Sequence, residues 1–223
     1  MPPPSEDDGL TERDLAVTVG PILERSAVLG FLGGMPISEQ IDHSVGFCEA
    51  AEGHLGRAPS SALDLGTGGG IPGLVLAALW PSLELTLFDA NERRTLFLTE
   101  EIEAWGISDR VRVLRGRAEE TGRDPGLRGA FELVTARSFG SPAVTAECAA
   151  PLLRTDGILV VSEPPDGDPS VRWPVQGLAT VGLAPGLVYR YRDRFSYQVL
   201  AKTAETPDRF PRRTGIPTKR PLF

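Results

Sequence analysis

Five glycines within eight residues, directly after a short apolar stretch, constrain the fold of this chain more than any other feature. Residues 62–65 (ALDL) fit a buried strand, and residues 66–73 (GTGGGIPG) fit a tight turn in which Pro72 suits the first turn of a helix. Glycine lacks a Cβ, so the backbone can turn sharply here and come close to a ligand. The segment therefore predicts a strand, a turn and a helix, with a ligand site at the turn.

Strand-like and helical patterns alternate beyond this turn. Short apolar strands are predicted at residues 83–88, 111–114, 133–136 and 158–162, and helical patterns lie between them at 74–79, 92–105 and 143–153. This alternation favours an α/β fold with a parallel sheet covered on both faces. Two later strand-like stretches, at 187–191 and 197–202, predict an antiparallel hairpin that closes the sheet.

The segments on either side of this core, which we place at residues 59–205, have a different character. Residues 1–9 combine prolines with acids, so we expect them to be disordered. Residues 10–58 show helical spacing interrupted by glycines, which predicts two or three helices. Prolines at 207, 211, 217 and 221 exclude a helix from residues 206–223 and predict an extended strap. All of these parts fit one domain of 223 residues.

Composition excludes several classes of protein. No apolar run is long enough to span a bilayer, and the acidic, proline-rich start is unlike a secretion signal. Two cysteines and two histidines leave little for a disulfide framework or a zinc site. We expect a monomeric, cytoplasmic protein without a metal and without a membrane partner. Although the net charge is −7, residues 186–223 hold nine basic and three acidic residues, which fits either contact with a polyanion or a solvated tail.

Two acids indicate which nucleoside the turn would bind. Asp89 ends the next predicted strand, where a carboxylate can accept hydrogen bonds from both hydroxyls of a ribose. Residues 68–73 satisfy the dinucleotide pattern G-x-G-x-x-G, but no Lys-Ser or Lys-Thr follows, which excludes a triphosphate loop. Asp64, two residues before the first glycine, disfavours a pyrophosphate and favours the cationic S-adenosylmethionine. The alternative is that Asp64 is buried and caps the turn.

Later strand ends offer further candidates. After the third predicted strand, the backbone at Ala118 and Glu119 can reach the adenine edge, although this stretch also fits an ordinary helix start. Arg137 follows the fourth strand, where it would hold phosphate or base oxygens of an acceptor or else form a surface salt bridge. Residues 163–166 (EPPD) are interpreted as a strand stop. His43 and His54 have no partner spacing and fit core or surface positions.

Three segments resemble the RsmG (GidB) family, bacterial methyltransferases that act on a guanine N7 of 16S ribosomal RNA. They are residues 64–73 (DLGTGGGIPG), residues 116–120 (GRAEE) with 136–139 (ARSF), and residues 210–222 (FPRRTGIPTKRPL). The resemblance, over residues 30–223, implies a class I methyltransferase fold, Rossmann-like, whose seven-stranded, mostly parallel sheet has an antiparallel last strand. One departure is Glu163-Pro164, where family members usually have Lys-Gly.

The resemblance also implies a donor, an acceptor and their contacts. The donor is S-adenosylmethionine, and the acceptor is 16S rRNA or the small ribosomal subunit. The donor contacts that the resemblance implies are Gly66, Gly68, Gly70, Asp89, Ala118 and Glu119, and we add Asp64 and Thr67 from the sequence of the turn itself. Arg137 is the expected catalytic and substrate-side arginine, and the cations expected to bind phosphates are Arg209, Arg212, Arg213, Lys219 and Arg220. Guanine N7 has a free lone pair, so no base is needed and catalysis would rest on alignment.

Two alternatives to this function stay open at the level of sequence. The first is a paralogue that methylates a small molecule or a protein, suggested by Glu163-Pro164 and the acidic composition. The second is a nicotinamide-dependent oxidoreductase or a non-catalytic nucleoside-binding module, because the glycine pattern alone is weak.

Overall fold

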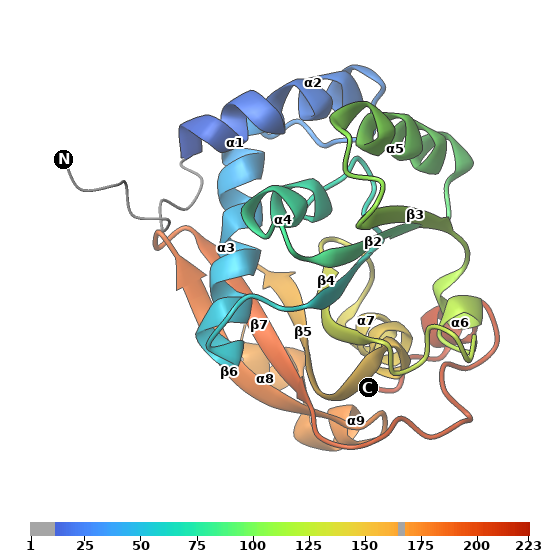
Figure 1. The fold of residues 1–223 in the computed structure, drawn as a ribbon. Helices are drawn as coiled ribbons and strands as arrows, with labels where there is room; N and C mark the ends of the chain where they lie inside the picture. Colours follow the sequence, from blue (N-terminus) through green and yellow to red (C-terminus); the bar gives the residue numbers. More distant parts are fainter. Residues whose placement is uncertain (1–11, 165–167) are drawn as a thin grey trace.

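A computed structural model describes residues 12–164 and 168–223. These residues form a seven-stranded sheet with helices on both of its faces (Figure 1). The strands are β1 (Ser61–Leu65), β2 (Glu84–Asp89), β3 (Val111–Arg115), β4 (Phe131–Ala136), β5 (Leu153–Glu163), β6 (Leu183–Tyr191) and β7 (Phe195–Lys202). Their order is β3-β2-β1-β4-β5-β7-β6, and β7 runs antiparallel to both of its neighbours. The predicted fold class is confirmed.

Alternate residues of the central strands enter two different apolar clusters. Ile158 and Val160 pack against the N-terminal helices, whereas Leu159 and Val161 pack on the opposite face. Because successive side chains of a strand point to opposite faces, a strand that is apolar at every position must be covered on both sides. The continuous apolar runs in the sequence thus have their physical reason in this two-sided burial.

Helices supply the two covering layers. The first layer contains α1 (Glu12–Thr18), α2 (Gly20–Val28), α3 (Ile37–Leu55), α4 (Gly73–Leu79) and α5 (Glu92–Trp105). The second contains α6 (Ala118–Thr121), α7 (Pro142–Ala149), the 3-10 turn η1 (Ala150–Leu152) and α9 (Val175–Ala179), whereas the short α8 (Pro169–Arg172) buries none of its residues. α5 has the predicted bounds, because Asn91 caps its first turn and Gly106 ends it in a left-handed conformation.

Two expectations about helices are wrong, one about where a helix ends and one about the strap. The helical pattern predicted up to residue 153 ends in η1, and β5 begins at Leu153, five residues before the predicted strand. The C-terminal strap also contains a short helix, α10 (Ile216–Lys219), where the sequence excluded one. Pro217 lies in the first turn of α10, where its missing N–H breaks no hydrogen bond. The disorder expected for residues 1–9 lies outside the described residues.

The carboxyl ends of the parallel strands meet at one edge of the sheet. Leu65 pairs with Phe88 of β2 and with Ala136 of β4, and Ala136 pairs with Val161 of β5. The loops that follow β1, β2, β4 and β5 are therefore neighbours, although they are far apart in the sequence.

Among the described residues, no helix combines the length and the apolar character that crossing a membrane requires.

Candidate active site

The glycine turn after β1 is held against the end of β2. The backbone N–H groups of Gly66 and Thr67 both donate to the carbonyl of Phe88, each over 2.9 Å. Gly66, Gly68 and Gly70 have φ values of 74°, 57° and 105°, which L side chains rarely adopt. The sequence needs glycine at these positions because the turn uses the left-handed region three times within five residues.

Asp89 lies where the turn meets the end of β2. Its Oδ2 accepts a hydrogen bond from the N–H of Gly68 over 2.9 Å, and its Oδ1 accepts one from Asn91 over 2.8 Å. Nη1 of Arg94 lies 3.6 Å from Oδ2. Arg94 was not predicted from the sequence, although its place in the first turn of the helix after Asp89 is a signal that points to it.

Asp64 lies beneath the turn and is 1% exposed. Its Oδ2 accepts from the N–H of Gly73, at the start of α4, and its Oδ1 accepts from the hydroxyl of Thr135, both near 2.9 Å. Burial raises the pKa of Asp64 to about 6, against the opposing effect of these hydrogen bonds. Asp64 therefore caps the turn, as the alternative interpretation has it, and it does not line the cavities at this edge of the sheet.

Two cavities open on this edge of the sheet. The first, here called the Asp89 cavity, has a volume of about 230 Å³ and is lined by Gly66, Asp89, Ala118, Glu119 and Phe139 among others. The second, the loop cavity, has a volume of about 350 Å³, and its lining includes Gly66, Thr67, Gly68, Gln40 and Arg137. Both are lined by Gly66, Arg94 and Ser138, so the two cavities are neighbours that share part of their walls. All the predicted donor contacts except Asp64 and Gly70 line one or the other.

A third cavity lies beyond the end of β4. This Glu163 cavity has a volume of about 320 Å³, and its lining includes His43, Ser138, Phe139, Glu163 and Trp173. Ser138 lines all three cavities and has a φ of 53°, a conformation unusual for a residue other than glycine. Strained backbone of this kind clusters at functional sites, and Ser138 lies at the junction of the three cavities.

Arg137 reaches the loop cavity from the end of β4. Its Nη1 donates to Oε1 of Gln40 over 3.0 Å, and burial lowers the pKa of its guanidinium. His43 packs edge-on against Phe47 and Phe195, and burial, together with the charge of Arg137, lowers its pKa to about 4. Of the core and surface positions expected for His43, the structure shows the core position, and its imidazole is neutral at pH 7. His43 also borders the Glu163 cavity.

The C-terminal strap docks on the second helix layer. Oε1 of Glu119 accepts from the N–H of Gly215 over 2.9 Å, so a predicted donor contact also holds the strap. The guanidinium of Arg212 forms hydrogen bonds with both carboxylate oxygens of Glu147, which is fully buried. This pairing argues against a phosphate-binding role for Arg212, because its guanidinium holds the strap in place. Arg213, Lys219 and Arg220 are exposed.

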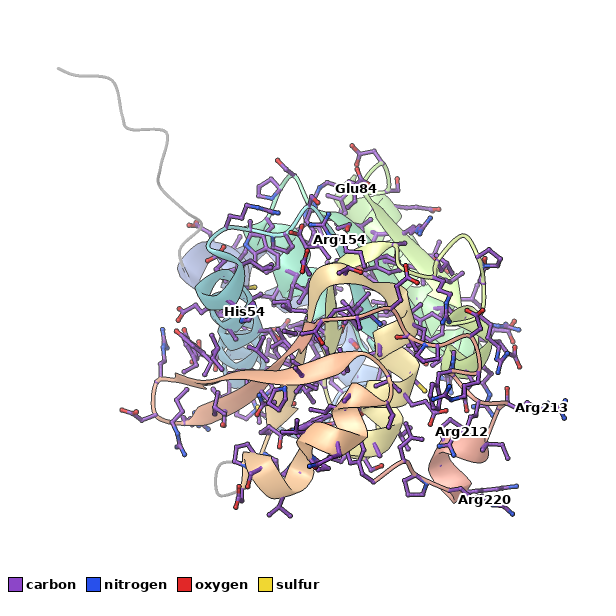
Figure 2. The ribbon with its side chains drawn as sticks, turned by 90° about the horizontal axis from the view of Figure 1, so that it is seen from below. His54, Glu84, Arg154, Arg212, Arg213 and Arg220 are labelled. Atoms are coloured by element: carbon purple, nitrogen blue, oxygen red, sulfur yellow. The ribbon has the colours of Figure 1, made fainter. Side chains whose placement is uncertain are left out.

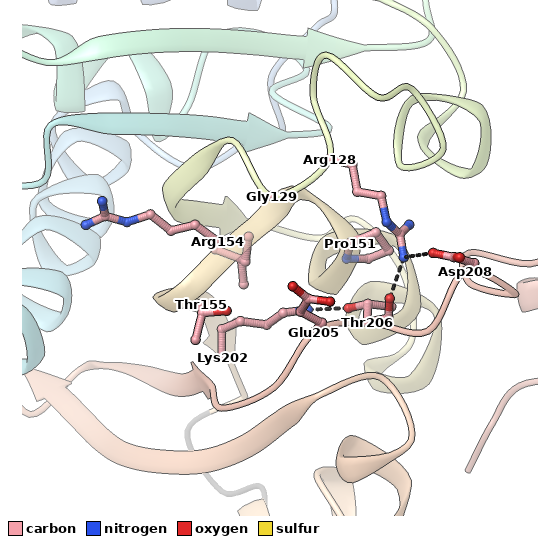
Figure 3. A pocket seen from close by; sticks show the side chains of 10 residues that line it. Arg128, Gly129, Pro151, Arg154, Thr155, Lys202, Glu205, Thr206 and Asp208 are labelled. Atoms are coloured by element: carbon pink, nitrogen blue, oxygen red, sulfur yellow. Dashed lines mark hydrogen bonds and ion pairs between the residues drawn. The ribbon is translucent and has the colours of Figure 1, made fainter.

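A further cavity, of about 350 Å³, opens at the other end of the strands (Figure 3). Its basic side chains are already engaged: Lys202 is buried and donates to the carbonyl of Ala150, and Arg128 donates to the carbonyls of Thr206 and Phe210. Burial lowers the pKa of Lys202 to about 8. These contacts tie the strap to the sheet, so we assign this region a structural role.

Comparison with known proteins agrees with this geometry. The family model of GidB, rRNA small subunit methyltransferase G, matches residues 43–163. A ribosomal RNA small subunit methyltransferase G from Streptococcus thermophilus is 33% identical over 175 residues, which cover 77% of this chain and 73% of the relative. The chain belongs to the rRNA small subunit methyltransferase G family. A relative with that name from Streptococcus pyogenes serotype M3 is 33% identical over 181 residues, with the same coverage.

Solved structures show the same fold at lower identity. A Burkholderia thailandensis 1,6-didemethyltoxoflavin-N1-methyltransferase with bound S-adenosylhomocysteine has a TM-score of 0.55 and 17% identity, over 90% of this chain and 94% of that one. As a member of the rRNA small subunit methyltransferase G family, the chain is an S-adenosylmethionine-dependent methyltransferase. The nicotinamide and binding-module alternatives lose their support.

The residues present fit this donor. A Cβ added to Gly68 would lie 3.8 Å from the nearest heavy atom of the protein, an ordinary contact distance, and Gly68 lines the loop cavity. Within residues 12–164 and 168–223, each oxygen of the Asp89 carboxylate accepts one hydrogen bond, and Arg94 pairs with Oδ2 at 3.6 Å, so lone pairs are left for sugar hydroxyls. The turn and Asp89 together form a cradle suited to the sugar and the amino acid end of S-adenosylmethionine.

Proposed function

We propose that the protein transfers a methyl group from S-adenosylmethionine to N7 of a guanine in 16S ribosomal RNA. The observation that carries this proposal is the meeting of the Asp89 and Glu163 cavities at Ser138 and Phe139. A donor in the first cavity would place its reactive end beside a base in the second. The names of the relatives supply the class of acceptor, small-subunit ribosomal RNA.

The donor contacts proposed here are those that line the cavities. Asp89 would accept hydrogen bonds from the ribose hydroxyls, while Gly66, Thr67 and Gly68 leave room for the chain of the amino acid. Ala118 and Glu119 would border the adenine. When bound, the donor supplies an electrophilic methyl carbon on a positively charged sulfur.

On the acceptor side, the protein has to align the guanine with the methyl group and does not have to remove a proton from it. Guanine N7 carries a free lone pair, so the reaction needs no general base and gains from holding nucleophile, carbon and sulfur in line. Arg137 would orient phosphate or base oxygens of the target nucleotide, because Gln40 fixes its guanidinium at the border of the loop cavity. Ser138 and Phe139 line both cavities and would border the base and the reactive end of the donor where the two meet.

The basic strap would bind the RNA backbone in the cytoplasm. Arg213 and Arg220 lie on one side of the molecule near the labelled Arg212 in Figure 2, and Arg213, Lys219 and Arg220 are exposed. Exposed cations of this kind bind phosphates by charge and release counterions. Arg209 stacks over the ring of Phe210 and extends the same segment. Arg212 is left out, since Glu147 already binds it.

Methyl transfer to ribosomal RNA tests this function. The purified protein is incubated with S-adenosylmethionine and 16S rRNA from cells that lack the gene, naked or within the small subunit, and the nucleosides are analysed by mass spectrometry. We expect 7-methylguanosine with the wild type, and a loss of about a hundredfold in rate with Arg137→Ala, because the target nucleotide is no longer held in position. Arg112→Ala, an exposed arginine of β3, is the matched control. Methyl label on a small molecule or protein, with none on RNA, would instead support the paralogue alternative.

A further inference from the structure

The Glu163 cavity contains a carboxylate whose place in the wall is fixed. The side chain of Glu163 is 4% exposed, its Oε1 accepts from the indole N–H of Trp173 over 3.1 Å, and its Oε2 accepts from Nε of Arg172. A carboxylate has about four lone-pair positions, so each oxygen keeps one after these contacts. Arg172 balances the negative charge, and the two donors hold the carboxylate in one orientation.

The same cavity has a second polar group, the imidazole of His43, and one of its nitrogens lacks a partner. Nδ1 of His43 is buried and forms no hydrogen bond among the described residues, and His43 is 9% exposed. Buried polar atoms are nearly always hydrogen-bonded to protein, water or ligand, so this nitrogen can bond to a water or to a polar ligand in the cavity. The cavity therefore combines a fixed anionic acceptor with an imidazole nitrogen that lacks a partner.

The chemistry of the Glu163 carboxylate selects one base. Guanine carries two hydrogen-bond donors side by side, N1–H and the N2 amino group, and a carboxylate can accept from both at once. Adenine and cytosine present one amino group next to an acceptor nitrogen, and uracil flanks its single N–H with two carbonyls. Each of these three bases would place an acceptor against the Glu163 carboxylate, which costs binding energy when the site is buried.

We propose that Glu163 is the residue that selects guanine, by accepting hydrogen bonds from N1–H and N2–H of the target base. This inference rests on the proposed function, since it identifies how the same acceptor site recognises its base. With the N1–N2 edge bound at Glu163, the opposite edge of guanine, which carries N7, faces away from the end of β5. Ser138 and Phe139, shared with the Asp89 cavity, lie on the donor side.

The charge of Glu163 also fits the reaction. In the transfer, the bond from sulfur to the methyl carbon breaks, a bond from N7 to that carbon forms, and the electron pair of the broken bond stays on sulfur. No proton leaves, so one positive charge moves from the sulfonium onto the guanine ring. That charge strengthens the hydrogen bonds from N1–H and N2–H to a carboxylate, and interactions that strengthen in the transition state accelerate the step.

Binding of two nucleotides to the protein saturated with S-adenosylhomocysteine tests the assignment. Guanosine 5′-monophosphate and inosine 5′-monophosphate differ only in the N2 amino group, so their dissociation constants, measured by calorimetry, isolate one hydrogen bond to Glu163. We expect the wild type to bind the guanine nucleotide about tenfold or more tightly. Equal binding of the two, or binding of neither, would overturn the proposal, and this comparison needs no variant.

The variant Glu163→Gln adds the protein side of the comparison. Its amide offers a single acceptor oxygen, so the preference for the guanine nucleotide should fall to about one, with the affinity for the inosine nucleotide little changed. Glu132→Gln is the matched control, because Glu132 is also buried and paired with arginines, Arg57 and Arg154, at the other end of the sheet. It should keep the preference. A preference that survives Glu163→Gln in a folded sample would give Glu163 a structural role only.

These outcomes are separable from the fate of the proposed function. If the protein prefers the guanine nucleotide but forms no 7-methylguanosine in 16S rRNA, the role of Glu163 stands and the proposed rRNA substrate is wrong. If the protein methylates 16S rRNA without preferring the guanine nucleotide, the proposed function stands and the proposed role of Glu163 is wrong.

Discussion

The backbone N–H of Gly68 donates a hydrogen bond to Oδ2 of Asp89, over a distance of 2.9 Å. It joins the turn after β1 to the last residue of β2, 21 positions away in the sequence. With the two bonds from Gly66 and Thr67 to Phe88, it fixes the loop before any ligand arrives. A site formed in advance loses less entropy on binding.

Gly68→Ala should weaken the donor site more than it weakens the fold. At a φ of 57°, an alanine is strained by about 1–2 kcal/mol, and this strain falls on the turn that lines the loop cavity. We expect the affinity for S-adenosylhomocysteine, measured by calorimetry, to fall about tenfold or more. Gly106→Ala, at a φ of 76° with open space around its Cβ, carries the same strain at the end of α5. Equal losses of affinity in the two variants would contradict this assignment.

Asp64 should make the stability of the protein fall as the pH rises through the range from 4 to 6. Its folded pKa of about 6 lies above the ordinary value of 3.8, so the native state binds more protons than the unfolded state between these values. The free energy of unfolding of the wild type, relative to Asp64→Asn, should drop by at most about 3 kcal/mol between pH 4 and pH 7. Urea unfolding at both pH values measures this. A difference that is constant or rises with pH would show that Asp64 is not held protonated by burial.

Arg212 and Arg213 are neighbours in the sequence and should respond differently to the same substitution. Arg212→Ala leaves the fully buried Glu147 without its partner, so we expect unfolding to become easier by about 3–5 kcal/mol. Arg213→Ala, at an exposed position, should change the free energy of unfolding by no more than about 0.5 kcal/mol. It should make the slope of the logarithm of the RNA-binding constant against the logarithm of the salt concentration less steep by close to one. Thermal unfolding and RNA binding at several salt concentrations separate the two. A stable Arg212→Ala protein would contradict the structural role of this pair.

Local patterns in the sequence were sufficient to predict most of the sheet. The alternation of apolar residues, the glycine turn and the place of Asp89 all follow from a few neighbouring residues, and the two-sided burial of residues such as Leu159 and Val160 produces the pattern directly. α5 was predicted with its bounds because a cap and a glycine mark its ends.

Contacts between distant segments could not be predicted in this way. Arg212 and Glu147 are 65 residues apart, and the sequence alone presents both as solvated charges. The position of Glu163 beside Trp173 and Arg172 depends on how the chain returns after β5. Asp64 was placed in the ligand site because its acidity fits a cationic donor, whereas Thr135 and Gly73 bind both of its oxygens beneath the loop.

The measurement that tests the donor site most directly is a calorimetric titration of S-adenosylhomocysteine into the wild type and into Asp89→Ala. We expect the wild type to bind it and to give no heat with NAD, and we expect Asp89→Ala to lose about tenfold or more in affinity. Asp89→Asn, which keeps one acceptor oxygen, should lie between them. Unchanged affinity in an Asp89→Ala sample that unfolds with the wild-type midpoint would contradict the account, as would NAD binding in place of S-adenosylhomocysteine.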